Sequence, residues 1–185
     1  MAKIPLKSRE ELPPDKRHVY DGITSTRGKI LNLFKVLLSS PDAAEAVGAL
    51  GAYLRYHSSL DPAAREIAIL TTAKELNVLY EWAHHEPIAR EVGVPDAVIE
   101  AIRSGRAPMG IPAKEGVFAQ AAKELLREGA LTDRTFQAIE HLVGPAGIVD
   151  LVVLVGHYAT IGGVLRTFEV EVDEGTPVSP GWPGT

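Results

Sequence analysis

The chain has 185 residues, of which 45% are hydrophobic and 23% charged, a composition typical of a single globular domain and unlike that of a disordered chain. Its 24 acidic residues outnumber its 19 basic residues, giving a formal charge of −5, so no general cationic surface is expected. We therefore expect no binding to nucleic acid or to an anionic membrane. The chain contains no cysteine, which excludes disulfides, thiolate metal sites, iron–sulfur clusters and cysteine-dependent catalysis.

The two ends of the chain differ from its middle. Residues 1–27 mix charges with prolines and lack the apolar stretch of a secretory signal, so a cytoplasmic location is expected. Residues 173–185 are rich in proline and glycine. The sequence predicts an N-terminal arm without regular structure over 1–27, a single domain over 28–172 and a C-terminal tail over 173–185.

Between the ends, helix start and stop signals recur, and the alternating pattern of strands is missing. Ser40-Pro41 and Asp61-Pro62 each combine a capping residue with a first-turn proline, and several glycines stand where a helix can end. The sequence therefore predicts an all-α fold of about seven to eight helices. The expected helices cover residues 28–38, 41–57, 62–76, 79–92, 95–105, 112–128, 133–143 and 146–170.

The helix expected over 146–170 is the most apolar segment of the chain. Its uncharged run from Leu151 to Leu165 is shorter than the roughly 20 residues that span a bilayer, so we expect no membrane insertion. Its glycines lower the helix propensity, a cost usually recovered where another helix packs closely. This segment should lie at the centre of the domain or at a subunit contact.

Candidate chemistry is concentrated in residues 60–92. Glu66 is followed by apolar residues three, four and seven positions later, which places its carboxylate on the buried face of its helix. Glu81 and His85 lie one turn apart on the inward face of the next helix. In an antiparallel hairpin these three side chains would converge. Two carboxylates in a partly dry pocket raise at least one carboxyl pKa and an imidazolium lowers it, which separates an acid from a base.

Each of these residues also has a structural interpretation. Glu66 could interact with the helix dipole or pair with Arg65, and Glu81 with His85 could be an ordinary i,i+4 pair. His84 lies about 100° around the helix from His85, which favours a surface or rim position.

Trp82 and His157 also have simpler interpretations. Core packing is the simplest explanation of Trp82, and stacking on a ligand is the alternative. His157, inside the most apolar segment, is more typical of a hydrogen-bonded core or interface residue than of a catalytic one.

A metal site is a third interpretation, because four possible ligands are close in sequence: Glu81, His84, His85 and Glu86. The two adjacent histidines cannot both face one ion from a regular helix. A further ligand would have to come from Glu66, His57 or His157, to which the spacing gives no direction. We therefore expect no metal.

A family resemblance is carried by YEWAHHEPIAREVGVPDAVIEAIRSG together with LDPAAREIAILTTA upstream. These segments resemble the carboxymuconolactone decarboxylase family, which includes the alkylhydroperoxidase D-like proteins. The segment GKILNLFKVLLSSP is similar to the family's first-helix segment. The carboxyl half of the family's proteins is similar to two later segments, FAQAAKELLREGALTDRTFQAIEHLVG and DLVVLVGHYATIGGVLRTFEVEV. The resemblance spans nearly the whole chain and implies an all-α domain that assembles as trimers or hexamers.

The family's peroxidases share a Glu followed by Cys-x-x-Cys-x-x-x-His, in which the thiols carry the redox reaction and the Glu and His relay protons. Here Glu66 matches the Glu and His85 matches the His, whereas Val78 and Glu81 occupy the cysteine positions. Peroxide reduction by thiolate attack is therefore excluded. What the resemblance leaves is an acid/base set of Glu66, Glu81 and His85.

The resemblance implies a cofactor-independent acid/base lyase that acts on a small carboxylated lactone or a similar anion, in aromatic catabolism. A related lactone isomerase or hydrolase fits the same residues. Decarboxylation would require stabilisation of a dienolate oxygen and then a proton for carbon. In this interpretation His85 is the donor or acid, Glu81 orients the imidazole, and Glu66 is a second proton relay.

Substrate binding is expected from Trp82, His84 and Arg65. A basic anchor for a substrate carboxylate is also expected, and the sequence does not rank the candidates Arg55, Arg65, Lys74 and Arg90. The alternative function is a non-catalytic, oligomeric small-molecule-binding module that kept the pocket after the thiols were lost.

Overall fold

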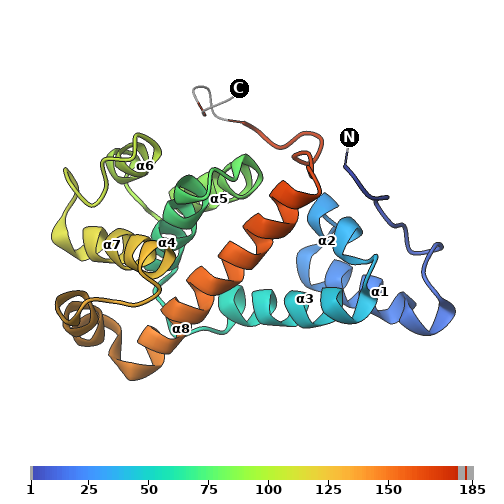
Figure 1. Ribbon diagram of the computed structural model, residues 1–185, viewed down its shortest axis with the longest axis horizontal. Helices are drawn as coiled ribbons and strands as arrows, with labels where there is room; N and C mark the ends of the chain where they lie inside the picture. The colour runs from blue at the N-terminus through green and yellow to red at the C-terminus, as the bar shows by residue number, and fades with distance from the viewer. Residues whose placement is uncertain (1, 179–181, 183–185) are drawn as a thin grey trace.

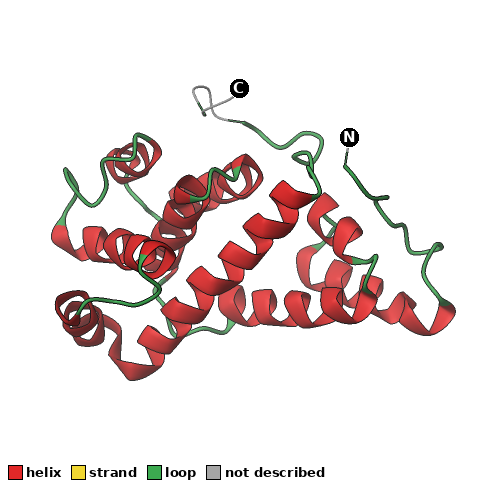
Figure 2. Cartoon of the chain, in the orientation of Figure 1, coloured by secondary structure: helices red, strands yellow, loops and turns green. Residues whose placement is uncertain are grey.

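The computed structural model describes residues 2–178 and residue 182, and every regular element in this part of the chain is a helix (Figure 1, Figure 2). The all-α fold expected from the sequence is confirmed. The elements are the 3₁₀ helix η1 (Pro14–Lys16) and the α-helices α1 (Arg17–Arg27), α2 (Asn32–Leu37), α3 (Pro41–Tyr56), α4 (Pro62–Glu75), α5 (Leu79–Glu91), α6 (Asp96–Arg103), α7 (Ala113–Arg127) and α8 (Asp133–Thr167).

Most helix ends follow the sequence signals, but the helix expected over 28–38 begins only at Asn32, because Gly28, with φ 74°, ends α1. Asp61 caps α4 by accepting hydrogen bonds from two backbone N–H groups in its first turn. Glycines with positive φ stand shortly after α5, α6 and α7, where a left-handed residue stops a helix: Gly93, Gly105 and Gly129. Ser40, in contrast, makes no side-chain cap hydrogen bond, so the start of α3 is marked by Pro41.

The expectation of an amino-terminal arm without regular structure was wrong. Within residues 1–27, α1 is a helix of 11 residues. It buries Val19 and Ile23, one turn apart, on the side that packs against α3. An apolar face of two residues among charges and prolines is too short to stand out in the sequence, and the tertiary contact with α3 stabilises it.

The carboxyl-terminal segment contacts the body of the protein at two points. Asp173 accepts a hydrogen bond from the backbone N–H of Asn32 at 2.9 Å and another from the hydroxyl of Tyr80. Further along, Trp182 is buried, with its ring centroid 5.1 Å from that of Trp82. The other residues of the expected tail beyond 178, namely 179–181 and 183–185, lie outside the described residues.

Two apolar clusters form the core. The larger one surrounds α4 with side chains from α5, α6, α7 and α8. The smaller one joins α1, α2 and α3 to the start of α5 and the last turns of α8. Because α4 is enclosed by helices, a charged residue on its inner face must find its partner inside the protein.

The helix α8 passes through the middle of the molecule (Figure 1) and contributes to both clusters. It consists of two parts, because Gly144 has the non-helical angles φ 67° and ψ 179° just before Pro145. The parts correspond to the two helices expected over 133–143 and 146–170. By length and composition α8 could also cross a membrane, yet 50% of its most apolar stretch is buried within the protein, as in the core helix of a globular domain.

Candidate active site

The helices α4 and α5 form a hairpin that reverses at Asn77, whose φ is 53°. The hairpin brings Glu66 and His85 together, with His85 Nδ1 2.6 Å from Glu66 Oε2. Their side chains are 1% and 5% exposed, so solvent screens the interaction little. The convergence expected from the sequence is therefore present in the structure, while the catalytic roles of these residues stay a prediction.

The other ring nitrogen of His85 has two oxygen neighbours. The hydroxyl of Tyr158 lies 3.1 Å from His85 Nε2, and Glu81 Oε2 lies 3.5 Å from the same nitrogen. Tyr158 belongs to α8, and its ring meets the imidazole edge-on at an interplanar angle of 88°. Tyr158 is not among the site residues that the sequence predicts. The one available signal was an aromatic residue with a polar tip beside His157 in an otherwise apolar helix.

The pKa values of the two carboxyl groups around His85 are shifted in opposite directions. Burial raises the pKa of Glu66, but the charge and hydrogen bond of His85, with Arg65 and Arg55, outweigh it and leave this pKa below its usual range. For Glu81, burial dominates and raises the pKa, although the charges of His85 and Arg55 oppose it. The imidazole therefore stands between an ionised carboxylate and a carboxyl group that favours its protonated form.

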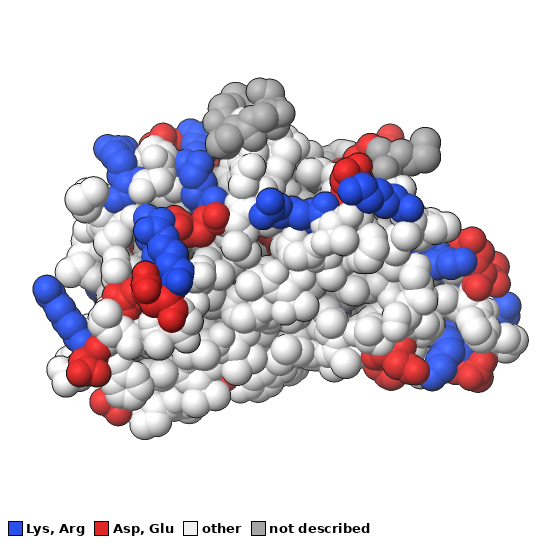
Figure 3. Space-filling view, viewed as in Figure 1, with Lys and Arg blue, Asp and Glu red and all other residues white. Residues whose placement is uncertain are grey.

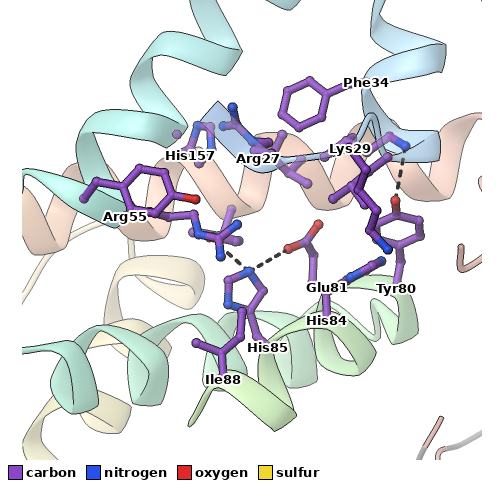
Figure 4. Close-up of a pocket in the computed structure, with 16 residues that line it drawn as sticks. Arg27, Lys29, Phe34, Arg55, Tyr80, Glu81, His84, His85, Ile88 and His157 are labelled. Atoms are coloured by element: carbon purple, nitrogen blue, oxygen red, sulfur yellow. Dashed lines mark hydrogen bonds and ion pairs between the residues drawn. The ribbon is translucent and has the colours of Figure 1, made fainter. Parts of the chain in front are cut away.

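A cavity of about 220 Å³ opens beside this cluster (Figure 4). Glu81, His85 and Tyr158 line it, whereas Glu66 lies behind His85 and does not. The remaining lining residues come from α1, α2, α3, α5, α8 and the segment between α1 and α2: Arg27, Lys29, Leu31, Leu33, Phe34, Gly51, Arg55, Tyr56, Tyr80, His84, Ile88, His157 and Ile161. A small molecule in this cavity would contact the Nε2 side of the imidazole.

Of the four basic candidates for an anchor, only Arg55 lines the cavity. Arg65 Nε instead lies 3.4 Å from Glu66 Oε1, on the closed side of the site, which argues against the expected substrate-binding role. Lys74 stands over the ring of Trp182, and Arg90 pairs with Glu86 and Asp96. The sequence could not rank these residues because their distance from the cavity depends on tertiary packing.

Trp82 does not line the cavity, so the expectation that it binds substrate is corrected. Its side chain is fully buried in the larger core cluster, and its Nε1–H donates a hydrogen bond of 2.9 Å to Glu86 Oε2. The reason is helical geometry: positions 82 and 86 share one face of α5, and positions 81 and 85 share the neighbouring face that meets the cavity.

His84 lies at the cavity wall, as a substrate-binding residue would. Its Nε2 is 3.1 Å from Asp173 Oδ2, and its ring stands 4.7 Å from that of Tyr80. Burial lowers its pKa despite the opposing charge of Asp173, which favours the neutral imidazole. His84 is thus held by the carboxyl-terminal segment while one side of it faces the cavity.

His157 also lines the cavity, although the sequence favoured a core or interface position. Burial, with the positive charges of Arg27 and His85, lowers its pKa to about 4, so the ring is neutral near neutral pH.

Across the described residues, no group of three His, Asp or Glu side chains is arranged to hold a metal ion.

Comparisons with known proteins agree with the all-α fold. Residues 41–124, which include Glu66, Glu81 and His85, match the model of the carboxymuconolactone decarboxylase family. No curated protein matches the sequence significantly. Among solved structures, the chain is similar to a peroxidase-related alkylhydroperoxidase AhpD core from Ralstonia eutropha JMP134, with a TM-score of 0.78 and 19% identity over 94% of this chain and 93% of that one.

Two further solved structures are similar over nearly their whole length. A peroxidase-related protein from Silicibacter sp. TM1040 has a TM-score of 0.76 and 15% identity over 95% of this chain and 93% of that one. A cysteine-to-alanine variant of the debrominase Bmp8, in complex with 2,3,4-tribromopyrrole, has a TM-score of 0.73 and 14% identity over 94% and 92%. At these identities the likeness establishes the fold, which is that of the alkylhydroperoxidase D-like proteins.

Proposed function

We propose that this chain is a cofactor-independent acid/base lyase. Its residues 41–124 match the carboxymuconolactone decarboxylase family, and it lacks the redox cysteines of the family's peroxidases. Its substrate is a small carboxylated lactone or a similar anion. The observation that carries the proposal is His85, held at Nδ1 by Glu66 and exposed at Nε2 to Glu81, Tyr158 and the cavity. Such an arrangement can hold a proton and deliver it to a bound molecule.

The reaction needs only proton donors if the electrons find an acceptor in the substrate. When the carboxylate leaves as CO₂, the pair of the broken C–C bond moves into the conjugated lactone carbonyl and forms a dienolate. A hydrogen-bond donor must then stabilise the dienolate oxygen, and an acid must protonate carbon. No electron leaves the substrate, so the reaction requires no thiol.

The residues divide these tasks by position. Glu66 lies on the closed side and fixes the orientation of His85, because its oxygen is 2.6 Å from Nδ1. Glu81 lies at the cavity wall and favours the protonated form, so it can supply the proton directly or through His85 Nε2. The hydroxyl of Tyr158 is a second donor at the same nitrogen and can stabilise the dienolate oxygen.

The similar structures include peroxidase-related proteins and a debrominase, so the fold supports more than one reaction and does not itself select a lyase. In this chain Glu81 and Val78 stand at the positions of the thiols. A carboxyl group at the cavity wall favours proton transfer over redox chemistry there.

The proposal is tested by incubating the purified protein with a panel of carboxylated lactones, without added metal or cofactor, and following CO₂ release and ultraviolet absorbance. We expect CO₂ release in proportion to the change in absorbance for at least one member of the panel. Binding of lactones without CO₂ release or isomerisation would instead support the non-catalytic binding module. Peroxide reduction with a dithiol reductant serves as the negative control and should match buffer.

We also propose that the protein is a homo-oligomer, a trimer or a hexamer. Exposed apolar side chains follow one face of α8, with Val149 61% exposed and Val152 and Val153 beside it. Exposed Tyr53 lies on α3, which packs against α8. Figure 3 shows a broad uncharged area across the middle of this side of the molecule. Light scattering should give a trimeric or hexameric mass, and a monomeric mass at micromolar concentration would contradict the proposal.

A further inference from the structure

The cavity has a basic wall. Arg27 stands at the end of α1, Lys29 follows it in the loop, and Arg55 comes from the last turn of α3. In Figure 4, Arg55 reaches towards His85, and Arg27 lies beside His157. Three basic side chains from two separate segments therefore border the same space as the acid/base cluster.

Within the described part of the chain, Arg27 and Arg55 have no carboxylate partner. Arg27 donates from Nη2 to the carbonyl oxygen of Gly48 at 3.1 Å, and its guanidinium carbon stands 4.5 Å from the centre of the Phe34 ring. Arg55 contacts the ring of Tyr56. Among residues 2–178 and 182, neither arginine forms an ion pair. In contrast, Arg9, Arg90 and Arg127 each pair with a carboxylate: Asp21, Glu86 and Glu75, respectively.

The charge of this wall is not balanced by the acids nearby. The charge of Arg55 acts on two carboxyl groups, those of Glu66 and Glu81. Both of these groups already pair with His85. Burial and the positive charge of Arg55 lower the pKa of Arg27, so these two like charges make each other less favourable. A bound anion would relieve this repulsion, because guanidinium groups bind carboxylate oxygens through pairs of hydrogen bonds.

Gly51, which has no side chain, leaves room at the cavity wall for the side chains of Arg27 and His157. A Cβ added at Gly51 would stand 3.2 Å from Arg27 Nη2 and 3.1 Å from His157 Nε2, closer than ordinary contacts. The body of a ligand would meet apolar lining residues such as Phe34 and Ile161. A cavity with charged and apolar parts suits an organic anion better than an inorganic one.

We infer that Arg27 and Arg55 together bind the carboxylate of a small organic anion and thereby orient it towards His85. The inference rests on the proposed function for the reaction that follows, and binding itself can be measured separately. Lys29, exposed at the cavity, adds positive potential that attracts the anion without fixing its orientation.

The test uses an inert ligand, the saturated lactone 5-oxotetrahydrofuran-2-carboxylate, and its neutral carboxamide. A saturated ring has no conjugated acceptor for the electrons, so the protein can only bind it. Binding is measured by calorimetry at constant ionic strength. We expect the carboxylate to bind and the carboxamide to bind much more weakly. Arg27→Gln and Arg55→Gln should each weaken carboxylate binding by roughly 10- to 100-fold, as expected for loss of charge-assisted hydrogen bonds.

Four further variants sharpen the measurement. Arg90→Gln removes an arginine whose partners are Glu86 and Asp96, away from the cavity, and should leave the affinity unchanged. Gly51→Ala should weaken binding by crowding Arg27, whereas Gly22→Ala on α1, where a Cβ meets nothing within 4 Å, should not. Arg27→Lys keeps the charge but loses the planar fork, and intermediate affinity is expected. Thermal midpoints show which variants are folded.

The outcomes separate this inference from the proposed function. Equal binding of carboxylate and carboxamide, or unchanged affinity in folded Arg27→Gln and Arg55→Gln, overturns the inference even if a lyase activity is found. Inorganic phosphate that binds as tightly as the carboxylate overturns the organic-carboxylate part. Carboxylate binding that needs both arginines supports the inference, and it does so whether or not any lactone in the panel is decarboxylated.

Discussion

Two buried acidic clusters in this protein are built from different partners. Glu124 on α7 is buried, and its carboxylate accepts hydrogen bonds from Gln120 Nε2 at 2.9 Å, from Thr135 Oγ1 at 2.8 Å and from the backbone N–H of Thr132 at 2.8 Å. Glu66 on α4 is buried more deeply, and its partners are His85 and Arg65. One cluster holds its acid with hydroxyl, amide and backbone N–H donors, and the other with an imidazole and a guanidinium group.

The hydrogen-bond partners of a buried carboxyl group distinguish a structural role from a chemical one better than its degree of burial does. Burial raises the pKa of Glu124, but its four side-chain and backbone hydrogen bonds outweigh this and lower the pKa, so the carboxylate stays ionised and fastens α7 to the start of α8. The cluster around Glu66 has a second carboxyl group, an imidazole and a phenol in contact, and it opens into a cavity. Of these two clusters, only the second joins several titratable side chains to a cavity.

The largest expected effect is the loss of turnover in His85→Gln. Glutamine keeps hydrogen-bonding capacity but cannot exchange a proton near neutral pH, so we expect the rate to fall by roughly 10²- to 10⁴-fold. Rates with the best lactone of the panel and thermal midpoints are measured together. Glu66→Gln should lose less, because it acts through the orientation of His85. Full activity of folded His85→Gln would falsify the acid/base assignment.

The next effect belongs to the structural cluster. Glu124→Ala leaves the backbone N–H of Thr132 and the hydroxyl of Thr135 without their acceptor, and we expect a loss of about 3 kcal/mol in the free energy of unfolding. Urea unfolding measures the loss, and the rate per folded molecule should not change. A stable Glu124→Ala protein with reduced turnover would contradict the distinction between the two clusters.

Much of the fold could be predicted from the sequence because its signals are local. Asp61 with Pro62 marks the start of α4, and the hairpin of α4 and α5 follows from two apolar stripes joined by a short turn. The helix α1 escaped prediction because only Val19 and Ile23 form its buried face, and its stability comes from α3.

Part of the candidate site could also be predicted from local sequence signals, and part depends on tertiary packing. Glu66, Glu81 and His85 come from one hairpin, so helical spacing sufficed to bring them together. Tyr158, Arg27 and Arg55 come from three other helices, and only the packing of α1, α3 and α8 places them at the cavity. Trp82 was assigned to the site because it is next to Glu81, whereas the helix turns it into the core.

A smaller effect concerns the stability of the protein in acid. The pKa of His157 falls from an ordinary 6.5 to about 4 in the folded protein, so between these values the unfolded chain binds a proton that the folded protein does not. Stability is therefore lost as the pH falls through this window. Between pH 7 and pH 4, the free energy of unfolding of His157→Asn should fall by roughly 2 kcal/mol less than that of the wild type, a value that allows for the partial exposure of His157. Urea unfolding of both proteins at pH 7 and at pH 4 measures it, and equal losses would contradict the prediction.

The smallest effect on stability is expected for Glu81→Gln, and its sign is opposite to that of His157. Burial raises the pKa of Glu81 above that of an unfolded chain, so the folded protein holds a proton that the unfolded chain has released. The wild type therefore loses stability as the pH rises from the ordinary carboxyl range to the raised pKa of Glu81. Glutamine cannot titrate, and its amide keeps a hydrogen-bond donor at this position.

Glu81→Gln should consequently be more stable than the wild type near neutral pH by about 1 kcal/mol, and the gain should disappear in acid, where Glu81 is protonated in both states. Urea unfolding from acidic to neutral pH measures the difference between the two proteins. A difference that does not change with pH would mean that Glu81 is not held protonated by burial. The same variant should lose turnover, because a glutamine amide cannot deliver a proton to carbon. A gain in stability combined with a loss of rate is what distinguishes a buried acid kept for its chemistry from one, like Glu124, that holds two helices together.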